Sequence, residues 1–296
     1  IDRVYSASRD CIVIAADRGR ARRLVVSASQ AAPRVCLTSA PPASLPEPTP
    51  FAMLLRKHLT GGRIVAVRQL DLDRVLIIQV EGWADADASQ NKLLIAEITG
   101  RLSNIVLTDM EGRILDAVRR VDQSRNRYRE LVPGAVYLPP PPMDRIDPRE
   151  TQTPEAFMAA IRRHVLQAQA RGQAQTPGQA SASASADGIG AVLARCFAGI
   201  GPTLGSELAF RAGLDPAQAA VELGDAELSR IWEPFSAFMR NAQAGQTERS
   251  VFEAALERTT EREAAQAVAM SCGGLSHLAD RFHIERFASA SDMIDT

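Results

Sequence analysis

Short apolar runs typical of strands recur along the first half of the chain, and they come twice in the same order. Ile1 to Ile14 aligns with Ile64 to Ile77 at a constant shift of 63 residues. The order continues at shifts of 69 and 70, where KLLIAEI repeats RLVVSAS and NIVLT repeats RVCLT. We interpret this pattern as an internal duplication in which each copy forms three short strands.

One helix is predicted between the two copies. From Phe51 to Leu59, apolar side chains recur at helical spacing, and Gly61 and Gly62 then stop the helix. Because the second copy has its helix directly before its strands, the helix of the first copy would precede Ile1. The sequence is therefore interpreted as a fragment trimmed at its front.

Two charged residues stand directly before the most apolar strand of the second copy. Val75 to Ile78 carries only β-branched or leucine side chains, and Asp73 and Arg74 precede it. A turn aspartate and a solvated arginine that mark the start of a strand would give this pattern. A polar contact site, held rigid by the strand that follows it, would give this pattern equally well.

After the second copy, the strand pattern ends and is replaced by a proline-rich stretch and helical patterns. A proline-rich stretch from Val132 to Pro148 predicts an extended linker, and Glu155 to Ala170 predicts an amphipathic helix. Residues 171–187 are poor in large apolar side chains and predict a mobile loop. We therefore expect one domain at residues 1–148 and a second, mainly helical domain at residues 149–296.

Within the second domain, a tight turn separates two predicted helices. The pattern is helical from Gly190, reaches Gly199, Ile200 and Gly201, and becomes helical again near Pro202. This is the form of a helix-hairpin-helix unit, in which glycines let backbone N–H groups approach a phosphate. A plain packing turn has the same composition, so both interpretations stay open.

Composition narrows the possible functions only slightly. The net charge of -1 divides into +4 for residues 1–150 and -5 for the remainder, and all but two of the basic residues are arginine. Arginine suits phosphate better than lysine does, because its guanidinium can donate two parallel hydrogen bonds. Composition alone does not establish a nucleic-acid partner. The four cysteines lack zinc-ligand spacing, and the sequence contains neither a signal peptide nor an apolar run long enough to span a membrane. We therefore expect a protein of the cytoplasm.

The sequence carries no recognisable catalytic motif, and its four histidines are scattered. We therefore predict no catalytic step, no cofactor and no metal. Polar residues do gather around the second copy, where basic side chains alternate with a tyrosine, a pattern suited to an RNA backbone and a stacked base. The candidate contacts are Arg56, Lys57, Asp73, Arg74, Glu97, Arg101, Ser103, Asn104, Arg127, Tyr128 and Arg129, with Arg119, Arg120 and Arg125 in the same basic stretch. A solvated arginine face is the alternative.

Five motifs, in order, carry a resemblance to a known family. FAMLLRKHLTGGRI, DLDRVLI, EITGRLSNIVLTD, RYRELVPGAVYLPPP and RFASASDMID are similar to stretches of the NFACT family, to which bacterial RqcH and eukaryotic NEMF belong. The resemblance covers most of the chain and implies an α+β fold. It implies a duplicated NFACT-N domain, similar to the N-terminal domain of formamidopyrimidine-DNA glycosylases, and then a helix-hairpin-helix domain that ends where a coiled coil would start.

The resemblance also implies a function. Proteins of this family bind obstructed large ribosomal subunits that still hold peptidyl-tRNA, and recruit tRNA, alanyl-tRNA in bacteria, to extend the stalled chain without mRNA. The residues that it marks as needed for this tailing fall on Asp73 and Arg74. A family aspartate would lie before Ile1, and Leu102 stands where the family usually has histidine. That departure leaves the role of the surrounding loop open.

Two other functions compete with this one. A DNA glycosylase would need an N-terminal proline nucleophile and usually a cysteine zinc finger, and the sequence shows neither. A surface adhesin that binds fibronectin, as an older family name suggests, would need an export signal or an anchor. Neither is visible in the sequence, so the ribosomal function is preferred.

Overall fold

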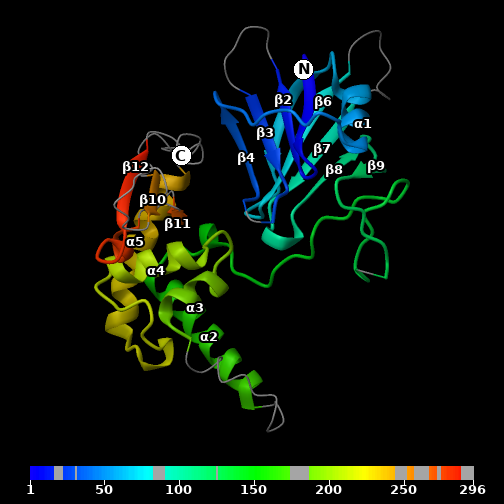
Figure 1. Cartoon of the computed structure of the whole chain (residues 1–296). Coiled ribbons are helices and arrows are strands. Elements are labelled where there is room, and N and C mark those ends of the chain that lie inside the picture. Colours follow the sequence, from blue (N-terminus) through cyan, green and yellow to red (C-terminus); the bar gives the residue numbers. More distant parts are fainter. Residues whose placement is uncertain are drawn as a thin grey trace. The chain divides into compact units, whose positions relative to one another are not determined.

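A computed structural model describes most of the chain, which divides into two compact units between Pro142 and Met143 (Figure 1). The described residues are 1–16, 23–30, 32–82, 91–124, 126–173, 187–243, 252–256, 267–271 and 275–287. They combine helices with antiparallel sheets, as expected for an α+β protein. The division falls six residues before the predicted boundary at residue 148.

Each copy of the sequence repeat forms its own antiparallel sheet in the first unit, with neighbouring strands paired in chain order. The first sheet contains β1 (Arg3–Ser8), β2 (Cys11–Ala15), β3 (Arg23–Ser27) and β4 (Arg34–Thr38). The second contains β5 (Arg63–Gln69), β6 (Val75–Glu81), β7 (Lys92–Glu97), β8 (Asn104–Thr108) and β9 (Ile114–Ala117). The prediction of three strands per copy is wrong, because the aligned stretch from Ile1 to Ile14 turns at Arg9 and Asp10 and contributes two strands.

The predicted helix between the copies is α1 (Pro50–Leu59), which begins where the Thr49 hydroxyl accepts a hydrogen bond from the Ala52 N–H. Its apolar stripe packs into a core that both sheets line. The core side chains are Val4, Ile12, Ile14, Val26, Phe51, Leu55, Leu59, Ile78, Val80, Leu94, Ile105 and Leu107. Two copies of a short meander thus bury their apolar faces against one another, which a single copy could not do.

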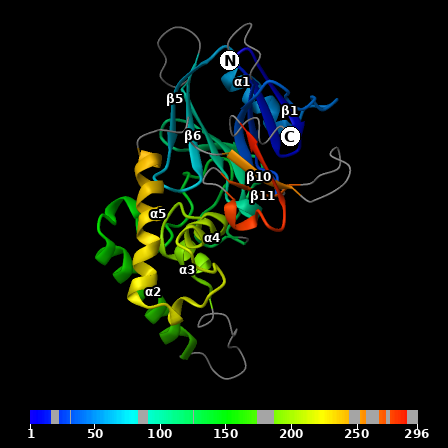
Figure 2. The same ribbon diagram turned by 90° about the vertical axis from the view of Figure 1, so that its left-hand side faces the viewer.

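The second unit begins as a helical assembly (Figure 2). Its helices are α2 (Pro154–Gln173), α3 (Ile189–Cys196), α4 (Pro202–Arg211) and α5 (Asp225–Gln243). Short 3-10 turns lie at Pro148–Glu150, Ala220–Glu222 and Ser276–Leu278. The predicted helix at 155–170 is present and extends by one residue at its start and three at its end. Most of the predicted mobile loop, residues 174–186, lies outside the described residues.

Stacked aromatic rings form the centre of this helical assembly. Phe157 and Phe197 stack with their ring centroids 5.4 Å apart, and Phe235 lies 4.7 and 4.9 Å from those two centroids. Helices α3 and α4 approach one another through Gly190 and Gly205, where a Cβ on Gly205 would stand 2.2 Å from the Gly190 carbonyl oxygen. Only glycine fits at that crossing.

The second unit also contains a small antiparallel sheet that the hydrophobic pattern did not indicate. Strands β10 (Phe252–Leu256), β11 (Ala267–Ser271) and β12 (His283–Phe287) form an antiparallel sheet with β10 in the centre. The described part of the second unit is mainly helical, as expected, but this small sheet was not predicted. Among the helices that the structure describes, none is both long and apolar enough to cross a membrane.

Candidate functional site

Neighbouring turns of the second sheet project from one end of the first unit. Because consecutive strands alternate in direction, the turn between β5 and β6 (Leu70–Arg74) and the turn between β7 and β8 (Ile98–Ser103) lie at the same end. The N–H of Ile98 donates to the carbonyl of Arg74 at 2.7 Å and so joins the two turns directly. We call this end of the unit the turn end. In Figure 1 the N-terminus lies at the opposite end of the sheets.

Asp73 and Arg74 occupy a backbone turn that is held at several points. The N–H of Leu70 donates to the carbonyl of Val75 at 2.9 Å, and the N–H of Asp73 donates back to Leu70 at 2.9 Å. The Gln69 side chain donates to the Asp73 carbonyl at 3.0 Å. The Arg74 side chain is exposed and the Asp73 side chain half-buried, and neither has a hydrogen bond or ion pair within the described residues. A rigid backbone therefore presents two unpaired charges.

The second turn exposes Arg101 and Leu102 but buries the residues that follow. Gly100 has a φ of 68°, a left-handed conformation that favours glycine, and Leu102 is 79% exposed. Asn104 is buried, donates to the Arg119 carbonyl at 2.7 Å and accepts from the Arg119 N–H at 2.9 Å. Ser103 is also buried. Neither predicted contact can reach an external ligand, and Asn104 instead ties β8 to the segment after β9.

The Arg119 side chain connects the two sheets at the turn end. It donates to the Ser103 carbonyl at 2.7 Å and to the Asp10 carboxylate at 2.9 Å. Asp10 lies in the turn between β1 and β2, so this ion pair brings a turn of the first sheet to the turns of the second. In the sequence Arg119 is part of a basic stretch, and its pairing with Asp10 could not be inferred there because the two residues are 109 positions apart.

Glu97 and Arg129, both predicted to contact RNA, are buried and bind one another instead. Both guanidinium Nη atoms of Arg129 bond the two carboxylate oxygens of Glu97, at 2.5 and 2.7 Å. The Tyr137 hydroxyl donates to Glu97 at 2.8 Å, and burial together with the Glu97 charge raises the pKa of Tyr137 far above its usual range. This cluster anchors a loop whose exposed side chains include Arg127 and Tyr128. Arg125 lies outside the described residues.

The remaining predicted contacts of the first unit lie on α1. Arg56 donates from Nε to the carbonyl of Val4 at 2.7 Å, which occupies its guanidinium in joining α1 to β1. Lys57 is exposed beside it. Both border a shallow hollow of about 500 Å³ with residues near the start of β1, such as Asp2. The structure therefore does not bring these two residues together with Asp73 and Arg74.

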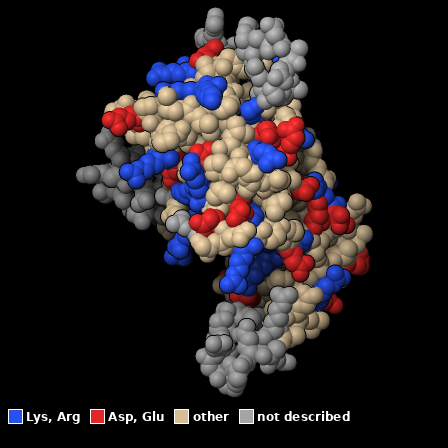
Figure 3. All heavy atoms as spheres, turned by 90° about the vertical axis from the view of Figure 1, so that its right-hand side faces the viewer, with Lys and Arg blue, Asp and Glu red and all other residues tan. Residues whose placement is uncertain are grey.

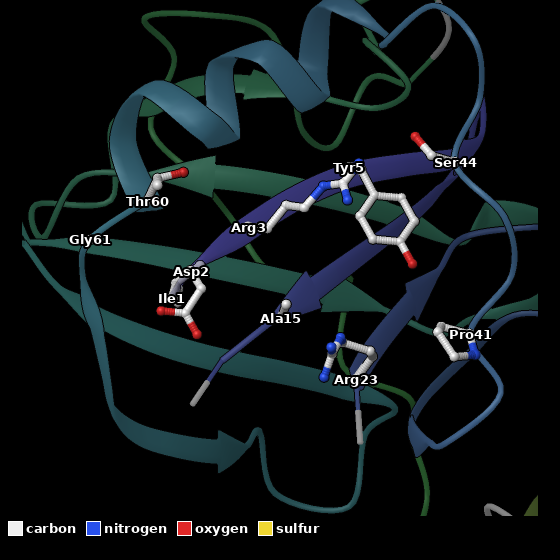
Figure 4. A pocket seen from close by; sticks show the side chains of 10 residues that line it. All are labelled: Ile1, Asp2, Arg3, Tyr5, Ala15, Arg23, Pro41, Ser44, Thr60 and Gly61. Carbon is white, nitrogen blue, oxygen red and sulfur yellow. The ribbon is translucent and has the colours of Figure 1, made fainter. Parts of the chain in front are cut away.

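A larger hollow of about 720 Å³ lies at that same end of the first sheet (Figure 4). Arg3 and Tyr5 of β1 and Arg23 of β3 line it, and the Arg3 guanidinium carbon lies 5.2 Å from the centre of the Tyr5 ring. None of the residues that line it belongs to the predicted set of contacts. It is separate from the turn end.

In the second unit, the predicted glycine turn joins α3 to α4. Gly199 has a φ of 76°, whereas Gly201 begins α4 with an ordinary φ of -88° and open space around its Cα. Within the described residues, the N–H groups of Gly199 and Gly201 have no hydrogen-bond acceptor, and both glycines are exposed, whereas Ile200 between them is buried. Such free N–H groups at a helix start can receive an anion.

A buried carboxylate in the second unit was not anticipated. Glu207 of α4 is fully buried, and its Oε2 lies 2.8 Å from His277 Nδ1 while its Oε1 accepts from Arg211 Nε at 2.8 Å. Burial alone would raise the pKa of Glu207, but its hydrogen bonds with His277, Ser276 and Arg211 outweigh burial and lower it. This cluster fastens the 3-10 turn before β12 onto α4.

The surface charge is mixed in sign. Figure 3 shows Lys and Arg interspersed with Asp and Glu over the face that it displays. No group of three or more His, Cys, Asp and Glu side chains in the described part of the chain is placed to hold a metal ion. The turn end, with its unpaired side chains on fixed backbone, is thus the best-defined candidate for a contact site.

Comparisons with known proteins agree on one family. The model of the NFACT N-terminal and middle domains matches residues 1–296. The Rqc2 homolog RqcH of Bacillus subtilis is 32% identical over 198 residues, which are 67% of this chain and 31% of that protein. The ribosome quality control complex subunit NEMF of Homo sapiens is 41% identical over 78 residues, which are 26% of this chain and 7% of that protein. The chain thus spans less than a third of the length of these relatives.

Solved structures have the same fold. A fibrinogen binding protein from Staphylococcus aureus is similar with a TM-score of 0.67 at 20% identity, covering all of this chain and 90% of that one. The N-terminal part of a fibronectin/fibrinogen-binding protein from Streptococcus suis has a TM-score of 0.62 at 24% identity, with the same coverage. At sequence identities this low, the structural similarity shows a shared fold and does not show a shared function. Because the family model spans every residue, the chain belongs to the family of proteins that share the NFACT N-terminal and middle domains.

Proposed function

We propose that the complete protein acts in ribosome quality control in the cytoplasm. It binds obstructed large ribosomal subunits that still hold peptidyl-tRNA and recruits tRNA, alanyl-tRNA in particular, to extend the stalled chain without mRNA. The names of the relatives, RqcH and NEMF, support this proposal. The protein acts as a binding factor that positions tRNA, while the chemistry of chain extension belongs to the ribosome.

The geometry of Asp73 and Arg74 is the observation that carries the proposal. The guanidinium of Arg74 can fork onto a phosphate or a base edge. Asp73 repels phosphate, so it accepts a hydrogen bond from a ribose hydroxyl or a base. A backbone turn held by four hydrogen bonds fixes the points from which both side chains project before RNA arrives. Binding therefore has to order the two side chains but not the backbone that carries them.

The second unit supplies a second contact in this proposal. We infer that α3 and α4 form a helix-hairpin-helix unit whose free N–H groups at Gly199 and Gly201 approach an RNA phosphate. We also infer that the first unit shares the fold of the N-terminal domain of formamidopyrimidine-DNA glycosylases. No glycosylase chemistry follows from that likeness, because function depends on the site and not on the fold.

The test replaces both residues in the full-length protein. Asp73→Ala with Arg74→Ala should abolish C-terminal tailing of a stalled chain, whereas co-sedimentation with large subunits, which depends on a far larger surface, should persist. The melting temperature should stay nearly unchanged, because exposed charged side chains contribute about 0 to 1 kcal/mol. Tailing is read from the mass of the stalled nascent chain.

Arg63→Ala is the matched control, since Arg63 is an exposed arginine at the other end of β5. Seven strand residues separate it from the turn by roughly 20 Å, and its loss should leave tailing intact. Normal tailing by the double variant would contradict the proposal. If protease added to intact cells cleaved the protein, and the protein did not co-sediment with ribosomes, the adhesin function would be favoured instead.

A further inference from the structure

The turn between β1 and β2 presents a charge that the proposed function does not use. Arg9 is exposed, and within the described residues its side chain has no hydrogen bond or ion pair. Its neighbour Asp10 is fully engaged, with Oδ1 accepting from the Ser8 hydroxyl at 2.7 Å and Oδ2 from Arg119 at 2.9 Å. The ion pair neutralises the carboxylate nearest to Arg9 in sequence and leaves the Arg9 charge available.

A continuous chain of contacts connects this turn to the turn end of the second sheet. Arg119 binds Asp10 with one Nη atom and the Ser103 carbonyl with the other. Ser103 closes the turn that displays Arg101, since its N–H donates to the Gly100 carbonyl at 3.0 Å. The same turn bonds the carbonyl of Arg74 through the N–H of Ile98 at 2.7 Å. Three turns, one from the first copy and two from the second, are therefore fixed together.

We propose that Arg9, Arg74 and Arg101 form one phosphate-contacting surface for RNA across both copies of the repeat, and that Arg119 is its positioning residue. This inference rests on the proposed function and adds the first copy to the site. Each of the three guanidinium groups is exposed and unpaired within the described residues. Each stands on a turn held by backbone hydrogen bonds, so the backbone positions from which the three side chains project are set before binding.

The turn that carries Arg74 also contains acidic side chains, which lower the positive charge of this surface. Asp71 and Asp73 lie in the same turn as Arg74, and neither forms an ion pair with an arginine within the described residues. Carboxylates beside guanidinium groups suit RNA better than a purely basic surface would, because they accept hydrogen bonds from ribose 2′-hydroxyls. Leu102, 79% exposed beside Arg101, adds an apolar contact for a ribose or a base. An acidic protein would use the arginines but neither of these features.

The experiment measures tRNA affinity of the full-length protein against salt concentration for Arg9→Ala, Arg101→Ala and Arg63→Ala. Each of the first two should weaken binding roughly threefold to tenfold and lower the slope of log affinity against log salt by about 0.7 to 1, as loss of one phosphate contact does. Arg63→Ala should change neither quantity. A photo-crosslinking amino acid at position 9 should capture RNA, and the same group at position 63 should not.

The outcomes separate this inference from the proposed function. If Arg9→Ala and Arg101→Ala bind and tail like Arg63→Ala, while Arg74→Ala abolishes tailing, the composite surface is wrong and the proposed function stands. If Arg74→Ala also tails normally, both are wrong. Crosslinking of position 9 to a protein and not to RNA would overturn the surface even if affinity falls.

Discussion

At the scale of single residues, the same chemical types have opposite roles according to burial. Glu97 and Arg129 are an acid and a base, as are Asp73 and Arg74, yet the first pair is buried and mutually bonded and the second is open. The charges of a buried ion pair have given up their hydration, so each depends on its bonded partners inside the protein. We therefore expect the two pairs to respond to substitution in opposite ways.

Glu97→Gln should lower the free energy of unfolding of the first unit. The substitution keeps the volume of the side chain but removes the charge that compensates Arg129, whose side chain is 8% exposed. Breaking a buried pair by removing one partner costs about 3 to 5 kcal/mol. Chemical denaturation of the full-length protein measures the change in the free energy of unfolding.

A matched double variant distinguishes a lost charge partner from a general packing defect. Glu97→Gln with Arg129→Met leaves no unpaired buried charge, so it should be more stable than Glu97→Gln alone. Arg74→Ala, at the exposed pair, should change stability by less than about 1 kcal/mol. A double variant less stable than the single variant would contradict the assigned role of Glu97.

At the scale of elements, the glycines of α3, of α4 and of the turn between them are under different structural constraints. Gly205 permits the close approach of α4 to α3, where its neighbour is the Gly190 carbonyl oxygen. Gly199 permits a left-handed backbone, with a φ of 76°. Gly201 has neither constraint, because its φ is ordinary and a Cβ added there would meet no atom within 4 Å. Three glycines that look alike in sequence thus differ in what a side chain would cost.

Gly205→Ala should destabilise the second unit, because its methyl group would stand 2.2 Å from the Gly190 oxygen and force α3 and α4 apart. Overpacking of this kind costs about 1 to 3 kcal/mol, and more where both neighbours are backbone. Gly201→Ala is the matched control and should cost at most about 1 kcal/mol as a weaker helix cap. Thermal unfolding compares the two, and equal melting temperatures would show that the helices accommodate the methyl group.

At the scale of the whole molecule, positive charge is concentrated in the first half of the chain. Residues 1–142 carry a net charge of +5 and residues 143–296 a net charge of -6, so the two units differ in their attraction for phosphate. Association with RNA releases counterions in proportion to the number of phosphates neutralised. The dependence of binding on salt therefore reports which unit makes the phosphate contacts.

Affinity of the full-length protein for tRNA should fall steeply as salt is added, and arginines of the first unit should carry most of the slope. Removing Arg74, Arg101 and Arg127 together should lower the slope by about 2 to 3. Removing Arg230 and Arg240, exposed on α5 of the second unit, should leave the slope unchanged. An equal effect of both sets, measured by salt titration, would contradict this division between the units.

Local pattern alone identified much of the fold. The apolar run from Val75 to Ile78 lies in β6, and the helical spacing from Phe51 to Leu59 lies in α1. The glycine-bounded turn between α3 and α4 was also visible. Side-chain alternation and turn residues act over a few positions, so these features can be inferred without knowing the fold. The duplication further indicated two similar sheets.

Only the tertiary structure decided which polar residues are available to a ligand. Glu97 and Arg129 are 32 positions apart, and Asp10 and Arg119 are 109 apart, so their pairing depends on which strands become neighbours. The sequence presents all four as charged residues close to turns. Strand pairing buries Glu97 with Arg129, uses Asp10 to hold Arg119, and leaves Asp73 and Arg74 open, because a charge stays buried only where the fold supplies its partner.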